Sequence, residues 1–283
     1  MHTTLTIPLH HRQPLTLGQR ALVMGILNVT PDSFSDGGQH NAVDAALAHA
    51  RLMLAEGADI LDIGGESTRP GADPVGVQDE LDRVIPVIDT IRAAGIAVPI
   101  SIDTMKPLVA HQALEAGADI INDVNGLQGA PEMAQIAAVM GAPVIAMHWD
   151  RDWTAETEPM PAMAAYFQRS IAIAAEAGID PSHIILDPGF GFTKTLTQNY
   201  NILRQLPELT RAFPDNALLV GTSRKSMIGK LLDNQPAERL PGTIATSVQG
   251  YERGGHIFRV HDVAPNRDAL RVAEATLYGP PQN

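Results

Sequence analysis

Short apolar runs recur along the whole chain, and each of them ends at or near a polar or charged residue. The clearest run covers residues 99–104, in which two isoleucines flank a serine before the chain reaches Asp103. The runs are rich in Ile, Val and Leu and are bounded by Gly, Pro, Asn or Asp, which is typical of strands buried on both faces. The eight runs are 21–28, 59–65, 99–104, 119–123, 143–148, 183–187, 217–223 and 256–262.

The stretches between consecutive runs are long enough for a helix, so the pattern predicts a repeated unit of one strand and one helix. Eight such units favour a closed parallel (β/α)8 barrel, an α/β fold whose chemistry lies at the carboxyl ends of the strands. A length of 283 residues is ordinary for one barrel, so we expect a single domain over residues 1–283. The predicted strand ends carry Asn28, Glu66, Asp103, Asn122, Asp187, Lys225, Arg259 and His261.

Residues 1–20 precede the first run and have a different pattern. Polar and apolar residues alternate in 4–7 and 15–17, on either side of Gln13-Pro14. This pattern predicts a β-hairpin with its turn at Gln13-Pro14, placed so that it closes the bottom of the barrel.

Helical spacing of apolar residues and capping signals mark several of the predicted helices. Asn41 is a good N-cap for the first, which we expect to end at Gly57, and Pro86 predicts a kink in the second. The segment 56–62 resembles 116–122, because in both a glycine ends a helix and a strand begins two residues later. This second helix is expected over residues 81–91, and further helices are expected at 131–140, 162–178 and 265–277. Residues 226–255 are expected to form a helix pair that turns near 234–236.

The composition narrows the class of protein. Apolar residues make up 45% of the chain, yet none of the runs approaches the ~20 residues of a membrane span, and we read no export signal at the N-terminus. Cysteine is absent, which excludes thiol catalysis and is compatible with the reducing cytoplasm we expect. The net charge of −12 argues against nucleic-acid binding and means that an anionic substrate needs a local cluster of cations.

Four strand-end and loop residues are suited to a phosphate group: Asn28, Arg69, Arg259 and His261. Arg259 and His261 are two positions apart on a strand and therefore point to the same side, where a guanidinium fork and a ring N–H can reach one ligand group. Asn28 ends the first strand, which adjoins the last one in a closed barrel, and its amide oxygen suits Mg²⁺. The alternative, equally open at this point, is that Arg259 pairs with Asp262 or another acid and His261 caps a turn.

A second group consists of Asp103, Asn122 and Asp187, which enter the mouth of the barrel from three different strands. An unpaired carboxylate there is costly, and a fused nitrogen heterocycle such as a pterin offers the N–H donors and ring acceptors that satisfy these side chains. Met147 and Phe192 can supply apolar faces for a flat ring, although either can equally belong to the core. The alternative is a structural polar layer, which is less plausible for three residues together with Lys225.

Two long loops and Ser223 form a third group. Glycine and proline in residues 29–38 and 68–71, together with Phe34, are typical of mobile covers over a site, while ordinary surface loops are the alternative. The chain has no Gly-rich dinucleotide fingerprint, no P-loop and no Gly-x-Ser-x-Gly nucleophile elbow. These three motifs therefore give no lead to a function.

Seven stretches together resemble one known family. Residues 27–38 and 64–71 are similar to the two signatures of dihydropteroate synthase, and the likeness extends in order from Met24 to the last helix. Because it is spread over many motifs, the resemblance is highly specific. The five later stretches are 101–104, 121–124, 186–192, 221–226 and 259–263.

The resemblance implies a barrel enzyme, usually a homodimer, that joins 6-hydroxymethyl-7,8-dihydropterin diphosphate to p-aminobenzoate with the help of Mg²⁺. The products are 7,8-dihydropteroate and diphosphate, and sulfonamides compete for the aminobenzoate site. By resemblance, the pterin is bound by Asp103, Asn122, Asp187 and Lys225 and lined by Val124, Met147, Gly221 and Phe192. The diphosphate and Mg²⁺ contacts fall on Asn28, Thr68, Arg259 and His261, and the aminobenzoate pocket on Phe34, Arg69, Pro70 and Ser223. The catalytic set implied in this way is Asp103, Asp187, Lys225 and Arg259.

The sequence departs from the family at residues 149–156, where many members have a basic stretch with Gly, Thr or Pro. Here the stretch is acidic and contains two tryptophans, so we expect altered loop packing rather than lost activity. Two other functions remain open from the sequence. A pterin-binding methyltransferase of corrinoid systems shares the barrel but needs no diphosphate cluster, and a non-catalytic pterin-binding relative would have lost motifs that are intact here.

Overall fold

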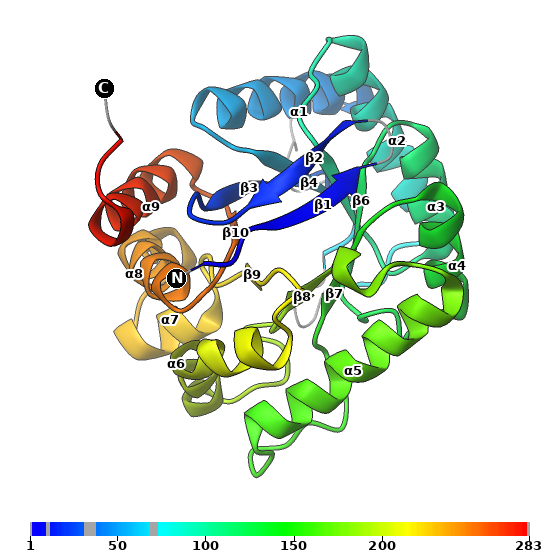
Figure 1. Cartoon of the computed structure of the whole chain (residues 1–283). Helices are drawn as coiled ribbons and strands as arrows, with labels where there is room; N and C mark the ends of the chain where they lie inside the picture. The colour runs from blue at the N-terminus through cyan, green and yellow to red at the C-terminus, as the bar shows by residue number, and fades with distance from the viewer. Residues whose placement is uncertain (1, 10–11, 31–37, 68–72, 282–283) are drawn as a thin grey trace.

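Eight parallel strands form the centre of the computed structural model, which describes residues 2–9, 12–30, 38–67 and 73–281 (Figure 1). Neighbouring strands pair in the order β8-β7-β6-β5-β4-β3-β10-β9, and a parallel bridge between Leu186 and Leu218 joins β8 to the chain just before β9. The barrel predicted from the sequence is therefore confirmed. The strands are β3 (Leu22–Asn28), β4 (Ile60–Gly64), β5 (Ile100–Asp103), β6 (Ile120–Asp123), β7 (Val144–Met147), β8 (Ile184–Asp187), β9 (Leu219–Val220) and β10 (Ile257–Val260).

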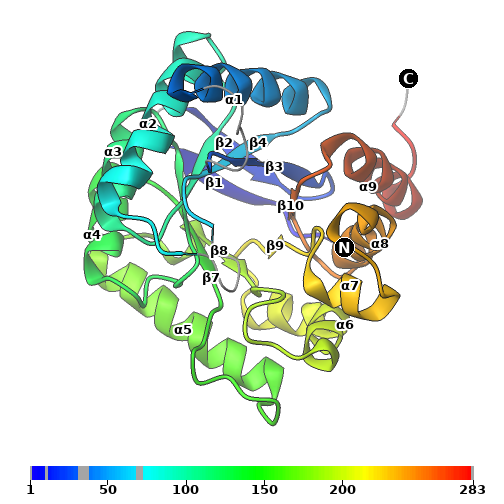
Figure 2. The same cartoon turned by 180° about the vertical axis from the view of Figure 1, so that it is seen from behind.

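Helices surround the strands on all sides, as the view from behind also shows (Figure 2). The first begins at Gly38 rather than at Asn41, so the predicted N-cap is wrong, and the second continues through Pro86. The helices are α1 (Gly38–Ala55), α2 (Val77–Ala93), α3 (Pro107–Glu115), α4 (Pro131–Met140), α5 (Pro159–Ala177), α6 (Leu196–Ala212), α7 (Ser226–Leu232), α8 (Leu240–Glu252) and α9 (Val263–Tyr278), with short 3-10 turns at Pro181–His183 and Pro236–Glu238.

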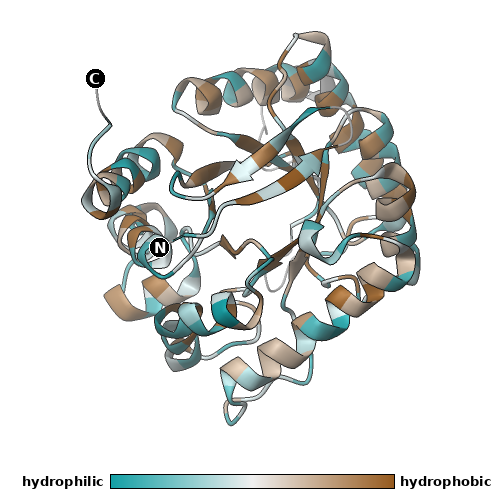
Figure 3. Cartoon of the chain, in the orientation of Figure 1, coloured by the Kyte–Doolittle hydropathy of each residue, from teal (hydrophilic) through white to brown (hydrophobic). Residues whose placement is uncertain are grey.

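The strands bury both of their faces. Outward residues such as Val23 and Leu27 pack against the helices, while Met24 and Ile60 point into the barrel with other aliphatic side chains. Figure 3 shows hydrophobic residues along the strands and mixed hydropathy on the helices, which cover the barrel with one face and meet solvent with the other. Because alternate residues point inward, the polar residue near each strand end is held at the mouth of the barrel.

The N-terminal hairpin is confirmed, although its predicted turn is wrong. Strands β1 (Leu5–Leu9) and β2 (Arg12–Leu17) pair antiparallel, and their apolar side chains pack on the residues that fill the lower barrel. The hairpin crosses the centre of the ring in Figure 1. Gln13-Pro14 lies inside β2, opposite an irregularity in β1 between Ile7 and Leu9. Proline is tolerated there because the irregularity interrupts the ladder hydrogen bonds that proline cannot donate.

No helix in the part of the chain described by the structure is long and apolar enough to cross a membrane.

Candidate active site

A buried ion-pair network occupies the mouth of the barrel. Arg259 of β10 donates from Nε to Asp62 Oδ2 and from Nη2 to Asp103 Oδ2, and both donor–acceptor distances are 2.6 Å. Asn122 of β6 donates from Nδ2 to the same Asp62 carboxylate at 3.3 and 3.4 Å. Residues from four strands are thus joined through one guanidinium and one central carboxylate.

Asp62 is the site residue that the sequence reasoning missed. Its side chain is fully buried on β4. The signal was a charged residue in the middle of an apolar strand, at the position that Asn122 occupies in the similar segment 116–122. A buried carboxylate needs a partner, so its place in the run pointed to a cation inside the barrel.

The network corrects the premise that the carboxylates of the mouth are unpaired. Asp103 is bound to Arg259, and the Asp187 carboxylate accepts a hydrogen bond from the Gly189 backbone N–H at 2.8 Å. Arg259 does pair with acids, but not with Asp262, which instead accepts two hydrogen bonds from Arg224. Arg259 therefore has a structural role, pairing the buried carboxylates of Asp62 and Asp103, whether or not it also binds a ligand.

Lys225 and Asp187 form the other side of the mouth. The Lys225 ammonium donates to the Phe190 carbonyl at 2.5 Å and lies 4.5 Å from the centroid of the Phe192 ring. Gly221 lies beside the Asp187 carboxylate: a first side-chain atom there would stand 3.8 Å from Asp187 Oδ2, an ordinary contact distance. Val124 and Met147 are buried near the ends of the intervening strands.

Burial and charge together set the protonation of the mouth. Burial raises the pKa of Asp103 to about 7, because the cost of desolvation and the repulsion from the Asp62 carboxylate outweigh the attraction of Arg259. Burial also raises the pKa of Asp187 and lowers the pKa of Lys225 to about 8, although Asp187 attracts the ammonium. For Arg259, burial acts to lower the pKa, but Asp62 and Asp103 outweigh it and raise the pKa, so the guanidinium stays charged.

Ser223 and His261 connect the last two strand ends. The Ser223 hydroxyl lies 3.0 Å from His261 Nδ1 and accepts a hydrogen bond from the His261 backbone N–H at 3.1 Å. His261 lines a cavity of about 530 Å³ together with Asn28, Arg224 and Asp262, and residues of α1 line its other side. The structure thus brings Asn28 and His261 to one cavity, as expected from barrel closure.

The metal prediction can be compared with the side chains around Asn28. Among the described residues, no group of three or more histidine or acidic side chains could hold a metal ion. Mg²⁺ commonly uses one or two protein oxygens together with waters and substrate phosphates, so a single amide oxygen fits an ion that arrives with a diphosphate. It does not fit a resident metal held by the protein alone.

Two lysines, the buried Lys194 and the half-buried Lys106, brace the loops around the mouth, and the sequence analysis did not single them out. Lys194 donates to the carbonyls of His148, Gly189 and Phe192 at 3.3, 2.9 and 3.2 Å, although burial lowers its pKa to about 7. Three acceptors match the three N–H bonds of an ammonium, so this lysine fastens the loop after β8 to the end of β7.

Lys106, just after β5, donates hydrogen bonds to the carboxylates of Glu66 and Glu80, each at 2.5 Å. Glu66 also accepts a hydrogen bond from the Val75 backbone N–H at 3.0 Å. The two ends of the segment between β4 and α2 are thereby tied together. Four predicted site residues lie outside the described part of the chain, so the structure says nothing of them: Phe34, Thr68, Arg69 and Pro70.

Comparison with known proteins identifies the family. A family model described as "Pterin binding enzyme" matches residues 24–261. The dihydropteroate synthase of Escherichia coli is 49% identical over 90% of this chain and 91% of its own. The chain belongs to the dihydropteroate synthase family.

Solved structures of other dihydropteroate synthases have the same fold. The Xanthomonas albilineans enzyme with 4-aminobenzoic acid superposes with a TM-score of 0.91 at 43% identity, covering 98% of this chain and 100% of that one. The Yersinia pestis enzyme, solved as a sulfonamide drug complex, has a TM-score of 0.87 at 44% identity, covering 96% and 99%. Dihydropteroate synthases at this identity and coverage favour the synthase over the corrinoid methyltransferase.

Proposed function

We propose that this chain joins 6-hydroxymethyl-7,8-dihydropterin diphosphate to p-aminobenzoate in folate biosynthesis, giving 7,8-dihydropteroate and diphosphate. The observation that carries the proposal is the mouth of the barrel, where Arg259 binds Asp103 while Lys225 lies against the loop after Asp187. Carboxylates that accept N–H groups and cations that attract phosphate are thus adjacent, as one substrate with a pterin head and a diphosphate tail requires.

The pterin head would lie between the carboxylates and the apolar wall. Asp103, Asn122 and Asp187 offer acceptors and an amide to the ring, and Lys225 offers a donor to a ring acceptor. Val124, Met147, Gly221 and Phe192 line the flat faces in this proposal. Support comes from the burial of Val124, Met147 and Gly221 and from the position of Phe192 against the Lys225 ammonium.

The reaction in this proposal needs no covalent enzyme intermediate. Asp103, Asp187, Lys225 and Arg259 are the catalytic residues: the carboxylates stabilise positive charge on the pterin methylene as its C–O bond breaks, and the cations stabilise the departing diphosphate. The amine of p-aminobenzoate then forms the new C–N bond and loses a proton. Exclusion of water from the mouth prevents hydrolysis of the activated methylene.

Asn28, Thr68, Arg259 and His261 would hold the diphosphate, and Asn28 would supply the protein oxygen for Mg²⁺. The metal, when bound with the diphosphate, neutralises charge on the leaving group. The support is the cavity shared by Asn28 and His261. We also propose that p-aminobenzoate, and sulfonamides in competition with it, bind beside Ser223 with Phe34, Arg69 and Pro70.

The direct test is formation of product from the two substrates. We expect 7,8-dihydropteroate and one diphosphate per turnover in the presence of Mg²⁺, and loss of both when the metal is chelated. If the protein binds the pterin but releases no diphosphate, it is a non-catalytic pterin-binding protein. If it binds methyltetrahydrofolate and not the diphosphate substrate, it is a methyltransferase component.

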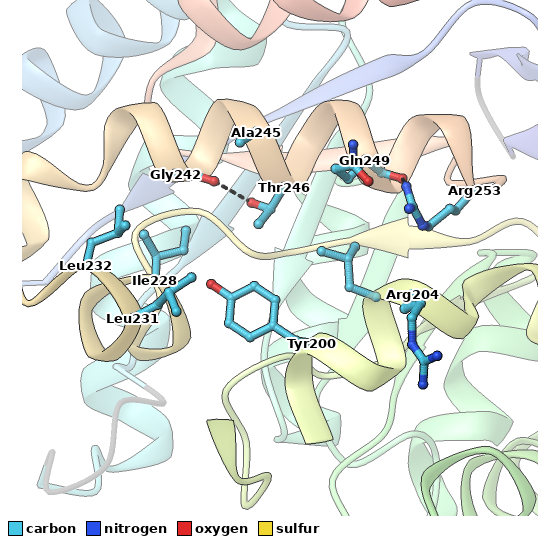
Figure 4. A pocket seen from close by; sticks show the side chains of 11 residues that line it. Tyr200, Arg204, Ile228, Leu231, Leu232, Gly242, Ala245, Thr246, Gln249 and Arg253 are labelled. Carbon is cyan, nitrogen blue, oxygen red and sulfur yellow. Dashed lines mark hydrogen bonds between the residues drawn. The ribbon is translucent and has the colours of Figure 1, made fainter. Parts of the chain in front are cut away.

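We further propose a cytoplasmic homodimer, with the second copy packed on an apolar groove between α6, α7 and α8 (Figure 4). Tyr200, Leu203 and Ile228 line the groove, and Leu231 and Leu232 at its edge are 58% and 50% exposed. Adjacent exposed leucines beside an apolar groove are a surface that a partner would bury. The cysteine-free composition suits a reducing compartment.

Replacing Leu231 and Leu232 together by glutamate is expected to convert the dimer to a monomer, because the charges would have to be buried at the interface. The mass in solution, measured by light scattering, should fall by half. Leu108→Glu is the matched control: Leu108 is 51% exposed on α3, away from the groove, and its replacement should leave the mass unchanged. A double variant that keeps the mass of the unchanged protein would remove this groove from the dimer model.

A further inference from the structure

The acidic stretch that departs from the family lies against the proposed pterin site. Trp149, directly after β7, meets the Phe192 ring edge to face, with centroids 5.0 Å apart and planes at 62°. The Arg151 guanidinium carbon lies 3.2 Å from the centroid of the Trp149 ring. Arg151 also donates a hydrogen bond from Nη2 to Asn125 Oδ1 at 3.2 Å.

These contacts form a continuous series that we call the aromatic ladder: Asn125, Arg151, Trp149, Phe192 and Lys225. Its members follow the ends of four consecutive strands, β6 to β9. The inner end of the ladder is the Lys225 ammonium at the Phe192 ring. The outer end is Asn125, whose backbone carbonyl accepts a hydrogen bond from the Tyr166 hydroxyl at 2.7 Å. The ladder therefore runs from the protein surface to the mouth.

Hydrogen bonds hold the backbone of Phe192: its N–H donates to the Gly189 carbonyl at 3.2 Å, and its own carbonyl accepts from the Lys194 backbone N–H at 2.7 Å. It sits on a glycine-rich loop, between Gly191, whose φ is +81°, and Thr193, whose φ is +57°. The backbone hydrogen bonds place the residue but do not set its side-chain rotamer, so contacts of the ring fix where the side chain points. Trp149 contacts the ring from the loop after β7, and Lys225 contacts it from the loop after β9.

We infer that Trp149 is a positioning residue for the pterin substrate, acting through Phe192, and that Arg151 holds Trp149 in place. The inference rests on the proposed function and deepens it. A cation over one face of the indole favours a fixed ring plane, and an edge-to-face pair then fixes Phe192. Trp149 itself does not have to touch the substrate.

The kinetic signature of this role is selective. In Trp149→Ala the KM for the pterin diphosphate should rise about 3- to 10-fold, the range that one aromatic pair supplies. The KM for p-aminobenzoate and kcat should change less than about twofold. Arg151→Ala should show the same selectivity with a smaller rise, and Trp149→Phe should restore most of the pterin KM because it keeps a ring against Phe192.

Trp153 provides the matched control, as the other tryptophan of the chain. It is buried, donates to Gln198 Oε1 at 3.0 Å and packs on His148 rather than on Phe192. Trp153→Phe should lower the melting temperature, but it should not raise the KM for the pterin diphosphate relative to the KM for p-aminobenzoate. Equal rises in both KM values in Trp149→Ala would mean that Trp149 only stabilises the loop, and would overturn the inference.

A double-mutant cycle tests whether Trp149 acts through Phe192. Calorimetric titration with 6-hydroxymethylpterin is the readout, since it does not require turnover. In a Phe192→Ala background, Trp149→Ala should cause no further loss of affinity, whereas additive losses would contradict the inference. The outcomes are distinguishable from failure of the proposed function: an unchanged protein that binds pterin without turnover refutes the synthase, while the cycle still decides the role of Trp149.

Discussion

Arg259→Ala is expected to destabilise the folded protein by about 3–5 kcal/mol, the cost of leaving a buried charge without its partner. Arg259 donates to Asp62 and Asp103, and the Asp62 side chain is completely buried. Without the guanidinium, two neighbouring carboxylates repel each other inside the barrel. Chemical denaturation of the two proteins measures this difference directly.

The same variant should bind the pterin diphosphate more weakly by about 1.5–3 kcal/mol, the scale of a charge-assisted hydrogen bond. That loss corresponds to roughly 10- to 150-fold in affinity. Titration must be done where the variant is still folded, with the thermal transition recorded under the same conditions. A lowered melting temperature with unchanged diphosphate affinity would make Arg259 purely structural.

Two controls separate these effects. Arg259→Lys keeps the charge but loses the fork, so it should retain more stability than alanine while binding diphosphate poorly. Arg20→Ala removes the arginine from an ion pair with Asp59 at the opposite end of the barrel, where Arg20 is 60% exposed. That exposed pair should contribute less than about 1 kcal/mol, and substrate affinity should not change.

The strand ends could be predicted because two simple patterns coincide in the sequence. A buried parallel strand is a mostly apolar run, and the polar residue that ends it marks the mouth, as Asp103 and Asp187 show. Strand β9 was less well predicted: the run 217–223 contains only Leu219–Val220 as regular strand. There the Leu218 N–H donates to the His256 side chain, a partner that no local pattern indicates.

Pairing inside the mouth could not be predicted, because it depends on which strands face one another across the barrel. Asp62 and Arg259 are 197 residues apart, and nothing near either one in sequence indicates the other. The same holds for Lys106, which joins one acid after the end of β4 to one in α2, and for the contact of Trp149 with Phe192. The sequence supplied the chemical groups, and closure of the barrel decided their partners.

The pH dependence of the reaction should be steep on both sides of a narrow optimum. Burial raises the pKa of Asp103 to about 7, and the carboxylate form is the one that stabilises a cationic pterin methylene. Below pH 7, kcat/KM should therefore fall about tenfold per unit, or about 100-fold by pH 5. On the alkaline side, burial lowers the pKa of Lys225 to about 8, so loss of its charge should weaken substrate binding above that value.

Stability should follow the opposite course in acid. The folded-state pKa of Asp103 lies above its unfolded value of about 3.9, so the folded protein binds this proton more readily than the unfolded chain. The contribution of Asp103 to the free energy of unfolding consequently rises as the pH falls from about 7 towards 4. Loss of activity between pH 7 and 6 thus does not come from unfolding driven by this carboxyl group.

The decisive measurement combines pH profiles of kcat/KM with thermal unfolding for the unchanged protein and Asp103→Asn. The asparagine cannot titrate, so the residual activity of the variant should lose its acid limb while the alkaline limb remains. The diphosphate of the substrate also titrates, and binding of 6-hydroxymethylpterin, which carries no phosphate, isolates the protein groups. If Asp103→Asn keeps the same acid limb in that binding profile, the limb belongs to another group, and Asp187, whose pKa burial also raises, is the next carboxylate to replace.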